Sequence, residues 1–203
     1  MPPGAGKKPA VILIHSYNGM EQGYRDLADE MAKAGYVTLA LGWQTFEKEP
    51  SDAVVKTLVE DGLKSLAARP DVNIANVGLT GFCAGGRYTM LLLPQLPQFK
   101  SGVAWYGFPE QGGTAAKPRP PSDFIAQLSR PMLIIHGTKD QPSPVSTIYT
   151  YAQKLDAANK VFKLAVYQGE PHSFLLKGGK IADTFASRDA RRAMLNYFGD
   201  TLK

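Results

Sequence analysis

The sequence of 203 residues contains a single cysteine, Cys83, and only three histidines. One cysteine excludes a disulfide within the chain and a zinc site built from clustered cysteines. No stretch approaches the roughly 18 consecutive apolar residues of a membrane span, and Met1 to Ala10 lacks the apolar run of a secretion signal. We therefore expect a soluble, cytoplasmic protein without a membrane partner, in which the thiol serves packing or reactivity.

The excess of positive over negative charge is also small, since the chain has 23 Lys and Arg and 18 Asp and Glu. The densest basic group, Arg188, Arg191 and Arg192, lies on a predicted helix beside Asp189. A nucleic-acid site would gather such charges in one patch, so we expect no nucleic-acid partner. The sequence has neither a cluster of metal ligands nor a glycine-rich phosphate loop. We therefore expect no metal and no organic cofactor.

Short β-rich apolar runs alternate with segments of helical period. This alternation is typical of an α/β fold with a mostly parallel sheet and helices on both faces. The length fits one domain spanning residues 1–203, without repeats or a linker. The expected strands are residues 11–14, 36–41, 76–80, 102–106, 131–136 and 162–167. The expected helices are residues 21–34, 51–70, 84–93, 145–158 and 188–202, the last with Ala190, Ala193, Met194 and Tyr197 facing inward.

Residues 107–123 interrupt the alternation with four prolines and three glycines. Such a composition indicates a loop. Because ligands bind near the strand ends of this architecture, we expect the loop to border the active site. An ordinary surface connection is the alternative.

Residues 81–85, Gly-Phe-Cys-Ala-Gly, fit the pattern G-x-S-x-G with cysteine in the serine position, between a predicted strand and a predicted helix. In this pattern the nucleophile sits in a strained turn at a helix amino end, where free N–H groups favour a thiolate and can bind an oxyanion. We expect Ala84 N–H as the first oxyanion donor and Tyr17, in the loop after the first strand, as the second. Packing as a small hydrophobe is the usual alternative for a lone cysteine.

An acid and a base follow Cys83 in the chain order of α/β-hydrolases, which is nucleophile, acid, histidine. Asp140 comes shortly after the strand at 131–136, and His172 lies in the loop after the last predicted strand. We therefore predict a Cys83, Asp140 and His172 triad. A turn or helix-cap role is the alternative for Asp140.

The other acids and histidines fit these roles less well. Asp123, Asp156 and Asp183 close no predicted strand. His15 and His136 precede the acid and cannot be the last triad member. We expect His136 to be a packed, hydrogen-bonded residue, and His15 to be structural or to border the oxyanion loop.

Aromatic residues near the predicted site favour an apolar pocket for uncharged acyl or aryl groups, although such residues more often belong to a core. The predicted substrate pocket contains Ser16, Phe82, Trp105, Tyr106 and Phe174.

From about Val11 to its end, the chain resembles the dienelactone hydrolase family of α/β-hydrolases. Residues 81–87 look like the family's G-F-C-x-G-G-[RK], residues 106–107 like its Y-Y-G strand end, and residues 171–174 like its histidine loop. The resemblance implies an α/β-hydrolase fold, a compact pocket, a Cys-His-Asp triad and activity on small esters or lactones.

Three departures from the family bear on the substrate. Dienelactone-cleaving members carry a glutamate near the resting thiol where this chain has Ser16, and a carboxylate-binding arginine where it has Leu176. The chain also begins almost at its first predicted strand, without the family's N-terminal hairpin, which predicts a smaller sheet or a shortened N-terminus. A carboxylated dienelactone is therefore a doubtful substrate.

Three functional hypotheses remain. The leading one is a carboxylic ester hydrolase that acts on small uncharged esters through a thioacyl-enzyme intermediate. The second is a dienelactone hydrolase that opens lactone rings. The third, of another class, is a non-catalytic binding protein that retains the hydrolase fold.

Overall fold

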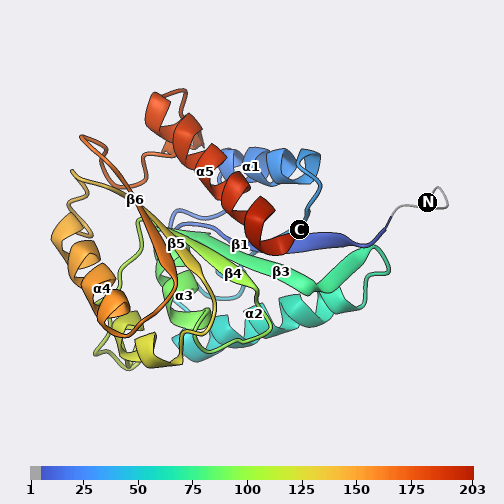
Figure 1. Cartoon of the computed structure of the whole chain (residues 1–203), viewed down its shortest axis with the longest axis horizontal. Coiled ribbons are helices and arrows are strands. Elements are labelled where there is room, and N and C mark those ends of the chain that lie inside the picture. Colours follow the sequence, from blue (N-terminus) through green and yellow to red (C-terminus); the bar gives the residue numbers. More distant parts are fainter. Residues whose placement is uncertain (1–5) are drawn as a thin grey trace.

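The computed structural model describes residues 6–203, in which a central sheet is covered by helices on both faces (Figure 1). The sheet has six strands in the order β2-β1-β3-β4-β5-β6, and each neighbouring pair is parallel. The strands are β1 Lys8–Ile14, β2 Val37–Leu41, β3 Val72–Phe82, β4 Ser101–Trp105, β5 Met132–Gly137 and β6 Phe162–Tyr167. The predicted α/β-hydrolase architecture is confirmed in this sheet and its two helical layers.

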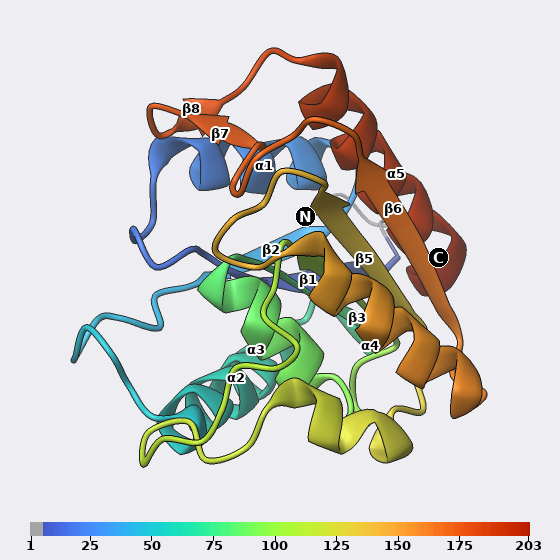
Figure 2. The ribbon, with the colours of Figure 1, turned by 90° about the vertical axis from the view of Figure 1, so that its left-hand side faces the viewer.

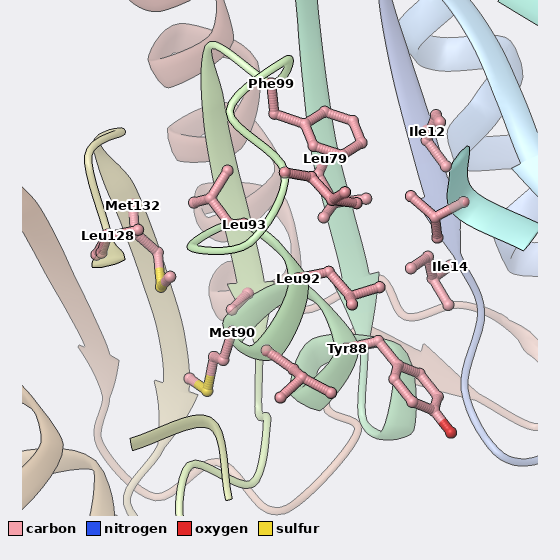
Figure 3. Close-up of a cluster of buried hydrophobic side chains, with 14 of the residues drawn as sticks. Ile12, Ile14, Leu79, Tyr88, Met90, Leu92, Leu93, Phe99, Leu128 and Met132 are labelled. Atoms are coloured by element: carbon pink, nitrogen blue, oxygen red, sulfur yellow. The ribbon is translucent and has the colours of Figure 1, made fainter. Parts of the chain in front are cut away.

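The two helical layers differ in composition. Helices α1 Gln22–Lys33 and α5 Phe185–Leu202 cover one face of the sheet, and α2 Asp52–Ala67, α3 Ala84–Leu92 and α4 Val145–Ala157 cover the other (Figures 1 and 2). Because successive side chains of a strand point to opposite faces, β1 supplies both layers. Val11 and Leu13 join the first layer, whereas Ile12 and Ile14 lie with Leu79 and side chains of α3 in the second (Figure 3). No helix within residues 6–203 has the length and apolarity that a membrane span requires.

Several predicted boundaries need correction. The first strand begins three residues early, at Lys8, and β3 extends beyond the prediction at both ends. The last helix begins at Phe185 rather than 188. Ala190 and Met194 face inward as expected, but Ala193 and Tyr197 are half-buried. Phe198 takes the inward place instead, because residues four apart lie on one face of a helix.

Three short elements were not predicted. Strands β7 Leu176–Lys177 and β8 Lys180–Ile181 form an antiparallel hairpin beside α1 (Figure 2). Its two-residue turn, Gly178 and Gly179, has φ of 59° and 75°, values that favour glycine. A 3-10 helix, η1 Pro121–Gln127, begins within the end of the predicted loop 107–123.

The strand order positions the candidate site. From β1 the chain moves outward to β2 and then returns to β3 on the other side of β1. In open parallel sheets, ligands bind at the carboxyl ends of strands where the order reverses in this way. The loop 15–19 leaves β1 at this point, and Cys83 leaves β3 beside it.

Candidate active site

Cys83 is the single residue between β3 and α3, with φ 57° and ψ −113°. Such a backbone is strained for a residue with a side chain, and strain of this kind gathers at functional sites. A Cβ atom on Gly81 would lie 2.1 Å from the Gly85 carbonyl oxygen, and one on Gly85 would lie 2.1 Å from the Ile14 carbonyl oxygen. Only glycine therefore permits this turn. The turn leaves the thiol partly exposed at the amino end of α3.

The structure brings together the predicted acid and base. His172 Nδ1 lies 2.7 Å from Asp140 Oδ2, and it is the donor because a carboxylate only accepts. His172 Nε2 is buried and has no hydrogen-bond partner among residues 6–203. The ring is therefore oriented by Asp140, with its second nitrogen available.

The surroundings raise the pKa of His172 to about 9. Burial alone lowers this pKa, but the acidic groups of Asp140 and Cys83 beside the ring outweigh burial. The imidazole is thus predominantly protonated near neutral pH. Because Cys83 is one of the groups that raise the pKa of His172, its thiol lies close to the ring.

A second histidine helps to hold Asp140, which is only 4% exposed. The Ser143 N–H donates to Asp140 Oδ1 at 2.8 Å. His136 Nε2 donates to the Ser143 carbonyl oxygen at 2.8 Å and lies 3.4 Å from Asp140 Oδ2. His136 is fully buried, as a packed residue was expected to be, and burial lowers its pKa. Asp140 Oδ1 is thus held by Ser143, which His136 holds in turn, and Oδ2 is left to accept from His172.

The loop 15–19 lies beside the first turn of α3, because Gly85 contacts the end of β1. Ala84 is the first residue of α3, so its N–H is one of those that have no partner within the helix. The Tyr17 side chain leaves the site, and its hydroxyl donates to Glu49 Oε1 at 2.5 Å. Any oxyanion role of Tyr17 would therefore fall to its backbone N–H.

The predicted pocket aromatics separate into two groups. Phe82 and Trp105 are fully buried in the layer of α1 and α5, with ring centroids 5.2 Å apart. Both end central strands, whose side chains face helices rather than solvent, so they support the site from beneath instead of lining a pocket. Tyr106 lies against His172, with ring centroids 5.2 Å apart, and Phe174 packs 5.8 Å from Tyr106. Tyr106 thus supports the His172 ring on the side that faces the core, and Phe174 supports Tyr106.

A carboxylate that the sequence reasoning missed also lies near the site. Ser16 Oγ donates to Glu21 Oε2 at 3.4 Å. Burial, together with the charges of Glu21 and Cys83, raises the pKa of both Tyr24 and Tyr106. Glu21 and the thiol therefore face the same two phenols. The sequence carries only a weak signal of this contact, namely an acidic residue five positions after Ser16 and just before a helix.

The predicted loop 107–123 reaches the site at its beginning. The Phe108 ring lies 5.5 Å from the His172 ring. Arg87, which is 1% exposed, donates to the Gln111 carbonyl oxygen at 3.0 Å and forms a paired contact with Asp52 at 2.6 and 2.9 Å. This buried arginine thus ties the loop to α2 and α3.

Two surface grooves flank these residues. One, of about 260 Å³, is lined by residues 108–111 with residues 142–144 and Thr147. The other, of about 400 Å³, is lined by residues 17–19 and 44–48. The first adjoins Phe108 on the acid and base side, and the second adjoins the loop after β1.

Comparison with known proteins identifies the family of this chain. A model of the dienelactone hydrolase family matches residues 1–202. A protein of Escherichia coli strain K12 named "Putative carboxymethylenebutenolidase" is 29% identical over 209 residues, which covers 95% of this chain and 77% of that protein. A protein of Bradyrhizobium named "Probable 2-oxo-3-(5-oxofuran-2-ylidene)propanoate lactonase" is 30% identical, over 83% of this chain and 74% of its own.

A solved structure extends the similarity to three dimensions. The crystal structure titled "Putative Dienelactone Hydrolase" from Klebsiella pneumoniae superposes with a TM-score of 0.86 at 29% identity, covering 98% of this chain and 89% of that one. The family model spans the turn at Cys83, the Asp140 loop and the His172 loop alike. The chain belongs to the dienelactone hydrolase family.

Proposed function

We propose that this protein hydrolyses small uncharged carboxylic esters, with Cys83 as nucleophile, His172 as acid and base, and Asp140 as the group that orients His172. One observation carries the proposal: the His172 ring is held by Asp140 at 2.7 Å while its other nitrogen remains free beside Cys83. A histidine held in this way can exchange a proton with a thiol and with a leaving group.

Acylation would begin with the Cys83 thiolate and a protonated His172, a state that the raised pKa of His172 favours. The sulfur attacks the carbonyl carbon, a C–S bond forms, and the carbonyl electrons move to oxygen. The Tyr17 and Ala84 N–H groups would bind that oxyanion. On collapse the C–O bond breaks, and His172 Nε2 gives its proton to the departing alkoxide.

Deacylation reverses the roles of the same groups. His172, now neutral, accepts a proton from water, and the hydroxide attacks the thioester carbonyl carbon. The C–S bond breaks, the carboxylic acid leaves, and the thiolate again faces a protonated ring. These steps need a reduced thiol, so we place the protein in the cytoplasm, where thiols are kept reduced.

Opening of a lactone ring is the second candidate. The reaction follows the same steps, but the leaving alkoxide stays attached to the acyl group. The names of the relatives favour this candidate, because they include a carboxymethylenebutenolidase and a lactonase. A panel of neutral esters and lactones of matched size would rank the two candidates.

Substitution of the nucleophile tests the proposal. Cys83→Ala should reduce ester hydrolysis to the background rate while circular dichroism stays unchanged, because the turn depends on Gly81 and Gly85 rather than on sulfur. Acid quench of the wild-type protein during turnover should give an acyl adduct on the peptide that contains Cys83. Turnover retained in pure Cys83→Ala protein would remove Cys83 from the mechanism. Cys83→Ser would report how well His172 assists a less acidic nucleophile.

A further inference from the structure

His15, the residue directly after β1, makes a hydrogen bond that has no role in the reaction steps proposed above. Its Nδ1 lies 2.7 Å from the carbonyl oxygen of Ser16, the next residue in the chain. A carbonyl oxygen only accepts, so His15 carries its proton on Nδ1 and donates. The side chain is 2% exposed, and burial lowers its pKa despite this hydrogen bond. His15 is therefore a neutral imidazole with one defined tautomer.

The carbonyl that His15 holds belongs to the peptide whose N–H is that of Tyr17. In a trans peptide the C=O and N–H point in opposite directions, so fixing one fixes the other. Ser16 O also accepts from the Gly19 N–H at 3.1 Å, which gives it two donors. A carbonyl that accepts hydrogen bonds polarises its own peptide, which makes the N–H at the other end a better donor.

The two neighbouring carbonyls of this loop, those of His15 and Tyr17, are held as well. The Trp43 indole N–H donates to the His15 carbonyl oxygen at 3.1 Å, and its ring lies 5.6 Å from the His15 ring. Gln44 Nε2 donates to the Tyr17 carbonyl oxygen at 3.1 Å. Three successive carbonyls thus have side-chain donors, whereas no hydrogen bond within residues 6–203 uses the Tyr17 N–H. The loop thus holds the carbonyls on both sides of the Tyr17 N–H and leaves that N–H free.

We propose that His15 is a positioning residue for the oxyanion site: its Nδ1–H holds the peptide between Ser16 and Tyr17 so that the Tyr17 N–H points at the oxygen of the reacting carbonyl. The inference rests on the proposed ester hydrolysis. His15 acts through this peptide and does not contact the substrate. His15 thus has a task separate from that of His172.

A pair of polar variants separates this role from simple packing. In His15→Asn the side-chain amide N–H lies near the place of Nδ1, whereas in His15→Gln it lies near the place of Nε2. Only His15→Asn can still donate to Ser16 O, although both are polar residues that fit a buried site. Ser101→Ala serves as the matched control, because it removes another buried hydrogen bond, to Thr201 at 2.7 Å, at the amino end of β4.

The expected result is a loss of kcat with little change in KM. His15→Gln should lower kcat by about 10- to 100-fold, somewhat less than deletion of an oxyanion donor. His15→Asn should stay within about fivefold of wild type, and Ser101→Ala within about twofold, since restored or distant hydrogen bonds leave the oxyanion donor in place. Equal losses in the Asn and Gln variants would overturn the proposal, as would unchanged kcat in His15→Gln.

Two inhibitors make the readout specific to the oxyanion. A short aliphatic aldehyde adds to the Cys83 sulfur and places its oxygen in the oxyanion site, so its affinity should fall in His15→Gln by the same factor as kcat. Iodoacetamide alkylates the sulfur without forming an oxyanion, so its rate should stay within about twofold of wild type. Parallel losses with both reagents would assign His15 a general structural role and overturn the proposal. Failure of the proposed function itself would look different, because Cys83→Ala would then retain turnover.

Discussion

The two sides of Cys83 use histidine in opposite ways. On one side, the His172 Nδ1–H donates to the Asp140 carboxylate, and the pKa of His172 rises to about 9. On the other side, the His15 Nδ1–H donates to a backbone carbonyl, and burial lowers its pKa. A carboxylate stabilises an added proton, whereas a neutral carbonyl offsets only part of the desolvation. The same bond length and the same donor atom thus give a group that titrates and a group that stays neutral.

Under the proposed roles, the side of Cys83 with His172 and Asp140, the acid and base side, depends on charge, and the side with His15, the oxyanion side, depends on orientation. Substitutions on the acid and base side should alter the pH dependence of the reaction as well as its rate. Substitutions on the oxyanion side should alter the rate and leave its pH dependence nearly unchanged. The predictions below test this division.

Asp140→Asn should break the acid and base side most severely. Asp140 Oδ2 accepts from His172 and Oδ1 accepts from the Ser143 N–H, so an amide must turn its NH₂ toward one of these donors. We expect kcat for a neutral ester to fall by about 10⁴-fold, as when a triad aspartate becomes an amide. Asp123→Asn is the control, because Asp123 is a half-exposed partner of Arg119. If Asp123→Asn caused the loss and Asp140→Asn did not, the acid would be misassigned.

The raised pKa of His172 predicts a pH-dependent stability. The folded value of about 9 exceeds the ordinary 6.5, so the stabilisation is fully present below pH 6.5 and is lost as pH rises through about 9. Compared with His172→Gln, wild type should lose about 3 kcal/mol of relative unfolding free energy between pH 6 and pH 10. Urea denaturation at several pH values measures this difference. His15→Gln should give no comparable trend, and a matching trend there would break the comparison.

Much of this arrangement could be predicted from the sequence, because its signals are local or follow chain order. The alternation of apolar runs predicts the sheet and its layers, and the glycines around Cys83 predict the strained turn. Asp140 and His172 are distant in sequence, yet both follow strands, and the carboxyl ends of parallel strands share one edge of the sheet. Their contact at 2.7 Å agrees with that expectation, while their catalytic roles remain predictions.

What the sequence did not provide depends on how separate segments pack. Aromatic composition cannot distinguish a pocket from a core: Phe82 and Trp105 were predicted to line the pocket, and both side chains are fully buried. The contact of Phe108 with His172 arises only when loops after different strands meet, and the contact of Glu21 with Ser16 depends on how the segment between β1 and α1 folds back on itself. The hairpin at 176–181 had a signal in its Gly-Gly turn, but its strands are only two residues long.

Substrate charge should sharpen the comparison on the oxyanion side. Glu21 places a carboxylate beside Ser16, and Leu176 is directed at Gly23 of α1 rather than at the site. We expect kcat/KM for a neutral short-chain aryl ester to exceed that for a carboxylated dienelactone by at least about 100-fold, roughly 2.7 kcal/mol in the transition state. Glu21→Gln should narrow this ratio, whereas Lys177→Ala, at an exposed position, should leave it unchanged.

Two results would contradict this prediction. Comparable efficiencies for the two substrates, reduced selectively by Lys177→Ala, would identify Lys177 as a relocated carboxylate-binding residue and the chain as a dienelactone hydrolase. An unchanged ratio in Glu21→Gln would remove Glu21 from substrate selection.

The smallest expected effect concerns packing on the acid and base side, where Phe108 contacts the His172 ring at 5.5 Å. If Asp140 fixes that ring through charge, as the comparison holds, then loss of the aromatic contact should matter little. Phe108→Leu keeps an apolar side chain, and we expect kcat to fall by only about threefold, or about 0.6 kcal/mol. Phe124→Leu is the control, because Phe124 lies later in the same region under Arg119 and should leave kcat unchanged. A loss in Phe108→Leu that approached that of Asp140→Asn would show that packing, rather than the carboxylate, sets the orientation of His172, and the contrast between the two sides of Cys83 would fail.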